Sequence, residues 1–226
     1  MGHFLEKRAV ASAAEAIAVS PFVARQIDRP THVVPNGVDV AKYAPRWEAR
    51  NGRRAIGVGE VAPHKQWHVA AEAARRAGCE LRVAGPLRDV PYAKRVEDLG
   101  ATLLGAVGED ELTAALGGSD VMLHPSVSES FGMAVVEGMS AGLPVVCSSL
   151  LSFLVADGVE GYHIPTDAGD EARAEAATAK LRILLDDAAM RRRMGDAARA
   201  KAVAGYSWDS VAARVEDVYR KASAAF

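Results

Sequence analysis

The feature that most restricts the fold of this chain is an alternation of short apolar runs with alanine-rich helical stretches. Several runs are apolar almost throughout, rather than at every second position, which is typical of parallel strands covered on both faces. The runs that we expect to be strands are Ala16–Val19, His32–Val34, Ala55–Gly59, Glu80–Ala84, Thr102–Leu104, Val121–His124 and Pro144–Cys147. The sequence therefore predicts a parallel sheet.

Helical segments lie between these runs, so that strand, turn and helix repeat in units of roughly 20 to 30 residues. The segments that we expect to be helices are Gln66–Ala77, Pro91–Leu99, Glu109–Leu116 and Met133–Ala141. Repeated strand–helix–strand units of this kind favour a doubly wound sheet. We therefore expect an α/β fold, a Rossmann-like parallel sheet with helices on both faces.

The two ends of the chain differ from this repeat. Residues 168–204 are charged and helix-forming, and Trp208–Ala222 places valines on one helical face, so we expect both segments to cover the sheet. Phe4–Val19 predicts a helix that leads into one strand, and a second helix and strand extend to Val34. These first elements are too few to form a domain core of their own, so they must pack on the main domain or on a partner.

Composition excludes several classes of protein. The formal net charge is −2, with basic and acidic residues interspersed. The sequence has no basic block of the kind that would indicate binding to nucleic acid. No apolar run is long enough to span a bilayer, and the first residues lack the pattern of a signal peptide, so we expect a cytoplasmic protein. Cys79 and Cys147 lie in separate apolar runs and are interpreted as core residues. The histidines have no convincing metal-ligand spacing, and no metal site is expected.

Ligands of an open parallel sheet bind beyond the carboxyl ends of its strands, so the residues after each strand are the informative ones. After the run that ends at Gly59, Lys65 stands where a helix is expected to begin. Free backbone amides and an ammonium group converge at such a position, which favours phosphate binding. A lysine at a loop–helix junction is nevertheless common on any protein surface, so this turn is weak evidence by itself.

A second cluster follows the run Val121–His124. Glu129 lies in the loop, Gly132 allows a close approach of the backbone, and a helix is expected to begin near Met133. Glu137 is four residues after Met133 and therefore shares its helix face. The two carboxylates could hold neighbouring hydroxyl groups while the amides hold a phosphate, although acidic residues near a helix start also simply favour the helix dipole.

Several motifs occur in a fixed order along the chain. They are PNGVD at 35–39, VGEVAPHK at 58–65, AGP at 84–86, SESFGMAVVEGMSAGLPVV at 128–146, DGVEGY at 157–162 and YSW at 206–208. This order resembles the carboxyl-terminal domain of the family 4 (group 1) retaining glycosyltransferases of the GT-B fold. The resemblance runs from about Glu15 to Tyr219, and the stretch 128–146 is its most specific part.

The resemblance implies a site for a nucleoside-diphosphate sugar, with no metal or other cofactor required. Lys65 would contact the diphosphate, Glu137 the ribose hydroxyls and Glu129 the donor sugar, so Glu129 and Lys65 are the expected catalytic residues. The other expected donor-binding residues are Gly59, Gly85, Pro86, Val107, Ser130, Phe131, Gly132 and Met133. Lys65 and the helix start could stabilise the leaving diphosphate in a retaining transfer.

Three positions depart from the family pattern. Glu60 stands where the family usually has an arginine that neutralises phosphate, and this loss could cost roughly 1.5–3 kcal/mol or more unless Arg88 or His64 compensates. Gln66 replaces the usual glycine after the lysine, and Ser149–Phe153 replaces a glycine-rich loop.

By the same resemblance, residues 1–34 are interpreted as a remnant of an amino-terminal acceptor domain or a linking helix and strand. Residues 35–205 would be the donor-binding domain and residues 206–226 a closing helix. The enzyme would be an incomplete hexosyltransferase as this chain alone, with an unknown acceptor and with a partner chain or homodimer formed through the first helix. The alternatives are a non-catalytic glycosyltransferase-like module that acts through a partner, and another enzyme on the same fold such as a sugar-nucleotide epimerase.

Overall fold

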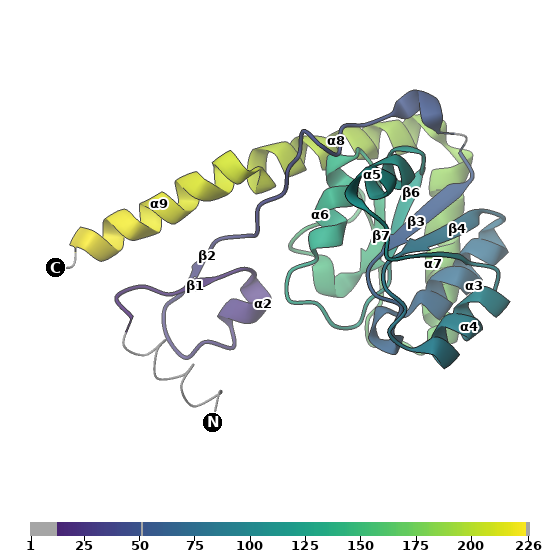
Figure 1. Cartoon of the computed structure of the whole chain (residues 1–226), viewed down its shortest axis with the longest axis horizontal. Helices are drawn as coiled ribbons and strands as arrows, with labels where there is room; N and C mark the ends of the chain where they lie inside the picture. Colours follow the sequence, from purple (N-terminus) through teal and green to yellow (C-terminus); the bar gives the residue numbers. More distant parts are fainter. Residues whose placement is uncertain (1–12, 51, 225–226) are drawn as a thin grey trace.

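The computed structural model describes residues 13–50 and 52–224, and its centre is a six-stranded parallel sheet (Figure 1). The strands are β3 (Arg54–Val58), β4 (Glu80–Ala84), β5 (Thr102–Gly105), β6 (Val121–His124), β7 (Val145–Ser148) and β8 (Gly161–Ile164). Their order across the sheet is β5-β4-β3-β6-β7-β8. The direction of winding reverses between β3 and β6, so the chain leaves a crevice at the carboxyl ends of these two neighbouring strands. The predicted Rossmann-like fold is confirmed.

Successive strand residues point to opposite sides of the sheet, and these strands are apolar almost throughout, so both faces of the sheet are apolar. Ala55 of β3 and Leu123 of β6 belong to one core cluster, whereas Ile56 and Met122 of the same strands belong to the other. The first core is closed by α3 (Trp67–Ala77), α4 (Val90–Asp98) and α7 (Asp170–Asp186). The second is closed by α5 (Glu109–Gly117), α6 (Met133–Ser140) and α8 (Ala188–Tyr206).

The strand β8 was missed in the sequence. Only two of its four residues are buried, since Tyr162 and His163 are half-buried at the edge of the sheet. Gly161 is required there, because a Cβ atom at this residue would lie 1.8 Å from the backbone carbonyl oxygen of Val145 in the neighbouring strand. The glycine therefore belongs to strand pairing as well as to the preceding loop.

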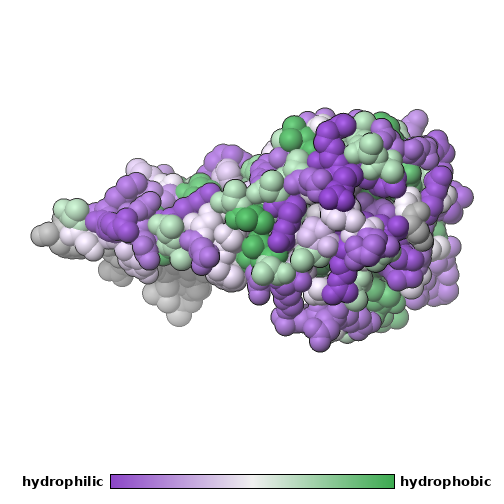
Figure 2. Space-filling view, turned by 90° about the horizontal axis from the view of Figure 1, so that it is seen from above, coloured by the Kyte–Doolittle hydropathy of each residue, from purple (hydrophilic) through white to green (hydrophobic). Residues whose placement is uncertain are grey.

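The prediction that the last helix covers the sheet is wrong. In Figure 1, α9 (Trp208–Ala224) projects away from the main body beside the N-terminal segment. Val211 and Val218 of α9 pack on Val34, and the ring of Trp208 lies against Gly37. Seen from above in Figure 2, the same elements form a narrow projection beside the broad body.

The N-terminal segment of the described chain is a small unit of its own. It contains β1 (Ile17–Ala18), the four-residue helix α2 (Pro21–Ala24) and β2 (His32–Val33), and the two strands pair in parallel. Ser20 connects this unit to the main body, because its hydroxyl donates a hydrogen bond of 2.6 Å to the carbonyl oxygen of Ser130. The expected helix Phe4–Glu15 falls largely outside the described residues.

Candidate functional site

A cavity of about 340 Å³ lies at the carboxyl ends of β3 and β6, where the winding of the sheet reverses. It is lined by Asn36, Val58, Gly59, Lys65, His124, Glu129, Ser130, Phe131, Gly132, Met133 and Ala134. Seven of the eleven residues expected to bind the donor or act in catalysis are therefore brought together. Gly85, Pro86, Val107 and Glu137 do not line this cavity.

The wall after β3 is built by a glycine and a lysine. Gly59 has a φ of 146°, and the side chain of Lys65 runs past it, since a Cβ atom at Gly59 would lie 3.6 Å from Cε of Lys65. Lys65 ends the short 3₁₀ helix η2 (Pro63–Lys65). Its side chain is only 14% exposed, so its ammonium group is held at the cavity and does not extend into solvent.

The facing wall is the loop after β6. Oε1 of Glu129 accepts hydrogen bonds from Nζ of Lys65 at 2.5 Å and from Nε2 of His124 at 2.8 Å. Burial raises the pKa of Glu129, but the hydrogen bonds and charges of His124 and Lys65 outweigh burial and lower the pKa to about 2. Glu129 is therefore a carboxylate across the physiological pH range.

The start of α6 completes the cavity. Gly132 precedes the helix with a φ of 99°, a left-handed conformation that glycine adopts without strain, and no side chain caps the first turn. The first amides of a helix have no partner inside the helix, and the helix dipole is positive at this end. This wall is therefore suited to an anion.

Glu137 lies one turn further along α6. Its Oε1 accepts a hydrogen bond of 3.5 Å from the hydroxyl of Tyr43, and burial raises the pKa of the Glu137 carboxyl. Burial and the charge of Glu137 together raise the pKa of Tyr43 to about 12. Lys42 next to Tyr43 pairs with Glu109 at the start of α5 at 2.6 Å. Glu137 therefore belongs to a separate polar group beside the cavity.

Gly85 and Pro86 support the first wall from behind. A Cβ atom at Gly85 would lie 2.0 Å from the carbonyl oxygen of Gly59, so only glycine allows the loops after β3 and β4 to approach so closely. The carbonyl of Pro86 accepts a hydrogen bond of 2.9 Å from the amide of Val61. Val107 is half-buried in the loop before α5.

The first departure from the family pattern, Glu60, is compensated locally. The carboxylate of Glu60 lies 3.4 Å from Nε2 of His64 and 3.4 Å from Nε of Arg88, and Glu60 is not among the residues that line the cavity. Its charge therefore faces these two basic groups.

The altered segment after β7 has a packing role. It forms the short 3₁₀ helix η3 (Ser149–Leu151), and Leu151 and Leu154 are fully buried beneath Gly132. The ring of Phe153 contacts that of Phe131 at 6.2 Å between centroids. The segment thus supports the start of α6.

His124 and Asn36 are cavity residues that the sequence reasoning missed. His124 is the last residue of a buried strand, and its place at the reversal point was the available signal. Its side chain is 1% exposed, and Nδ1 has no hydrogen-bond partner. Asn36 lies in the PNGVD motif, which carries part of the resemblance but was assigned no role in binding.

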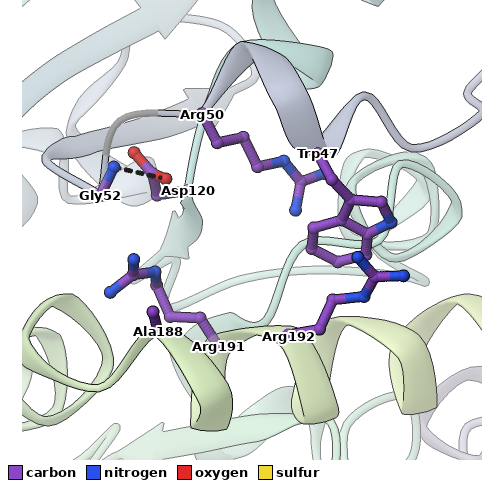
Figure 3. A pocket seen from close by; sticks show the side chains of 7 residues that line it. All are labelled: Trp47, Arg50, Gly52, Asp120, Ala188, Arg191 and Arg192. Atoms are coloured by element: carbon purple, nitrogen blue, oxygen red, sulfur yellow. Dashed lines mark hydrogen bonds between the residues drawn. The ribbon is translucent and has the colours of Figure 1, made fainter.

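A second cavity, of about 370 Å³, lies beside the amino ends of β3 and β6 (Figure 3). The ring of Trp47 contacts the guanidinium groups of Arg50 and Arg192, whose central carbons lie 3.9 and 4.1 Å from the ring centroid. Asp120 accepts hydrogen bonds from the amides of Gly52 and Arg54, and Arg50 donates to the carbonyls of Gly117, Ala141 and Gly142. These side chains close helix ends and loops, so we interpret this cavity as structural.

The described residues contain neither a group of metal ligands nor a helix that could span a membrane. Among residues 13–50 and 52–224, no three His, Cys, Asp or Glu side chains are grouped so that they could hold a metal ion. None of the described helices combines the length and apolar character needed to cross a membrane.

Comparison with known proteins decides the family. The family model described as "Glycosyl transferases group 1" matches residues 44–201, which include both walls of the cavity. The chain belongs to the group 1 glycosyltransferase family.

Individual group 1 relatives are longer than this chain. It is 34% identical over 204 residues to the MMP alpha-(1->4)-mannosyltransferase of Mycolicibacterium hassiacum. The aligned region covers 85% of this chain and 49% of the relative. The chain therefore spans about half the length of this curated relative.

Solved structures show the same fold. A sucrose-phosphate synthase from Thermosynechococcus elongatus superposes with a TM-score of 0.83 at 23% identity, covering 99% of this chain and 62% of the other. HepE from Anabaena, solved in complex with UDP and glucose, superposes with a TM-score of 0.76 at 18% identity, covering 92% and 63%.

Proposed function

We propose that this chain binds a nucleoside-diphosphate sugar and forms the donor half of a retaining glycosyltransferase. The observation that carries the proposal is the convergence of Lys65, Glu129 and the uncapped start of α6 on one cavity at the reversal point of the sheet. A diphosphate needs positive groups on two sides, and the ammonium and the helix start offer them.

Each residue has a distinct part in the proposal. Lys65 and the amides of Gly132 and Met133 stabilise the charge that develops on the leaving diphosphate, without a metal ion. Glu137, one helical turn away, accepts hydrogen bonds from the ribose hydroxyls. Glu129 faces the donor sugar, and the hydrogen bond from His124 keeps its carboxylate in place when Lys65 turns to the phosphate.

Two observations support an intact donor site over a non-catalytic module. Glu60 faces His64 and Arg88, so its charge is not directed into the cavity. The segment after β7 packs beneath α6 and is not among the residues that line the cavity. These two departures from the family pattern, which would favour a non-catalytic module if they disabled the site, therefore leave the proposed phosphate position open.

Calorimetric titration of the chain with UDP, GDP and ADP tests the proposal. We expect one of the three nucleotides to bind, and the Glu137→Ala variant to bind it at least about tenfold more weakly, because a charge-assisted contact to the ribose is lost. If the folded wild-type chain binds none of the three, the proposal is wrong.

We further propose that the acceptor, a glycan, lipid or small molecule, is bound together with a second polypeptide or a second copy of this chain. Ile17, Phe22 and Val33 of the N-terminal unit and Trp208 and Tyr219 of α9 are large hydrophobic side chains that stay exposed. Exposed apolar surface of this kind favours association. Light scattering at high protein concentration would detect the complex, and a monodisperse monomer would contradict a homodimer.

A further inference from the structure

Arg173 of α7 is a buried arginine outside every sequence motif described above. It is 1% exposed, and its guanidinium group donates to three oxygens from three different loops. Nε donates to the carbonyl of Pro165 at 3.0 Å, Nη1 to Oε1 of Gln66 at 2.8 Å, and Nη2 to the carbonyl of Pro125. Its planar fork spreads the three donors over three nitrogens, whereas a lysine would have to reach all three oxygens from a single nitrogen.

The three acceptors lie beyond the carboxyl ends of three strands. Pro165 follows β8, Gln66 lies in the loop after β3, and Pro125 follows β6 directly. Gln66 and Pro125 are each the next residue after one that lines the cavity, Lys65 and His124. One guanidinium group therefore fixes the spacing between the two walls of the proposed donor site.

Gln66 has an unusual backbone conformation. Within the part of the chain that the structure describes, it is the only non-glycine residue with a positive φ, at 58°. Its side-chain amide donates to the carbonyl of Pro63 at 3.0 Å and accepts from Arg173 on its other side. A glutamine in this left-handed conformation is strained, so surrounding contacts must hold it there.

The two loops are also joined directly. The backbone carbonyl of His64 accepts a hydrogen bond of 3.0 Å from the amide of Val127 and one of 3.3 Å from the hydroxyl of Ser126. These bonds fix the backbone one residue before Lys65, and Gln66 with Arg173 fixes it one residue after. The backbone of Lys65 is thus fixed on both sides, while its ammonium group bonds to Glu129.

We propose that Arg173 and Gln66 are positioning residues that hold Lys65 in place for the donor diphosphate. This inference rests on the proposed function, because it assigns a task to residues behind the same site. With the loop already ordered, binding of the nucleotide does not have to order Lys65, which strengthens the binding. It also explains how this chain tolerates Gln66 where the family pattern has glycine.

The test uses Gln66→Asn, with affinity for the nucleotide that the wild-type chain binds and the thermal midpoint as readouts. Asparagine tolerates the left-handed conformation but is one methylene shorter, so it cannot reach Arg173. We expect the affinity to fall about tenfold, because binding of the nucleotide must then order Lys65 and its loop. In a Lys65→Ala background, the same change should alter the affinity by less than about twofold, because the effect acts through Lys65.

A matched arginine control separates positioning from general loss of stability. Arg199 on α8 donates from one nitrogen to the carbonyls of Val40 and Ser140, away from the cavity. Arg199→Lys should keep the wild-type affinity, whereas Arg173→Lys should weaken it at temperatures where both variants are folded.

The outcomes distinguish the two proposals. Suppose that the wild-type chain binds a nucleotide. If Gln66→Asn binds it equally well, or if Gln66→Asn lowers the affinity as much in the Lys65→Ala background as in the wild type, the positioning role is wrong and the donor site stands. If the folded wild-type chain binds no nucleotide, both proposals fall.

Discussion

At the scale of single residues, the centre of the proposed site is the ion pair of Lys65 and Glu129, which lines the donor cavity. The side chains of Glu129 and Lys65 are only 12% and 14% exposed. One carboxylate oxygen of Glu129 contacts both Lys65 and His124. Removing one partner of such a buried pair leaves the other charge uncompensated. The site is therefore ordered before a ligand arrives, and its charges make stability depend on pH.

Glu129→Gln should reveal this dependence. The folded-state pKa of Glu129, about 2, lies below the ordinary value of 4.5, so its charge stabilises the fold above about pH 4.5, and this contribution is lost as the pH falls towards 2. The difference in unfolding free energy between wild type and Glu129→Gln should therefore shrink over that range, by up to about 3 kcal/mol.

Urea denaturation of both proteins at neutral pH and near the lower end of that range measures the difference. A difference that stays constant with pH would show that His124 and Lys65 do not stabilise the carboxylate.

At the scale of elements, the central strands and their helices could be predicted because each strand carries two apolar faces. Glu80–Ala84 and Val121–His124 are found with the expected bounds. Within the site, His124 ends a predicted strand only five residues before Glu129, so the sequence held a signal for it. Arg173 could not be predicted, because it reaches the loops behind the site only through the packing of a helix distant in sequence. The edge strand β8 escapes prediction because two of its four residues are only half-buried, and the course of α9 because it depends on packing against Val34, distant in sequence.

Helix α8 offers a matched pair of glycines that tests its packing against the loop after α6. A Cβ atom at Gly195 would lie 2.3 Å from the carbonyl oxygen of Gly142, whereas one at Gly205 would lie no nearer than 3.9 Å to Arg214. Gly195→Ala should lower the unfolding free energy by about 1–3 kcal/mol through overpacking. Gly205→Ala should leave it unchanged or raise it by up to about 1 kcal/mol, since alanine favours helix.

Chemical denaturation of the two variants beside the wild type measures both effects. Equal stability of the two variants would contradict the close approach of α8 to Gly142.

At the scale of the whole molecule, the chain consists of a Rossmann-like body and a projection made from its two ends. The projection is joined to the body near the site, since Ser20 bonds to Ser130 and the amide of Val38 donates to the carbonyl of Tyr206 at 2.8 Å. Figure 1 shows α9 and the N-terminal unit on the same side of the body. A second polypeptide that docks on the projection would therefore lie beside the donor cavity.

Val218→Asp should loosen the projection without altering the cavity. Val218 is 7% exposed against Val34, whereas the adjacent Tyr219 is 69% exposed. A buried unpaired carboxylate is costly, so amide hydrogen exchange along α9 should rise in Val218→Asp and stay near wild type in Tyr219→Asp. Equal exchange in both variants would contradict the packing of α9 on Val34.

The position of the ligand is the most direct test of the donor site. We would record the backbone amide NMR shifts of the chain while adding the nucleoside diphosphate that it binds. The largest changes should fall on Gly132, Met133 and the loop that carries Lys65, at the carboxyl ends of β3 and β6. Changes centred instead on Trp47, Arg50 and Arg192, beside the amino ends of these strands, would contradict the proposed site.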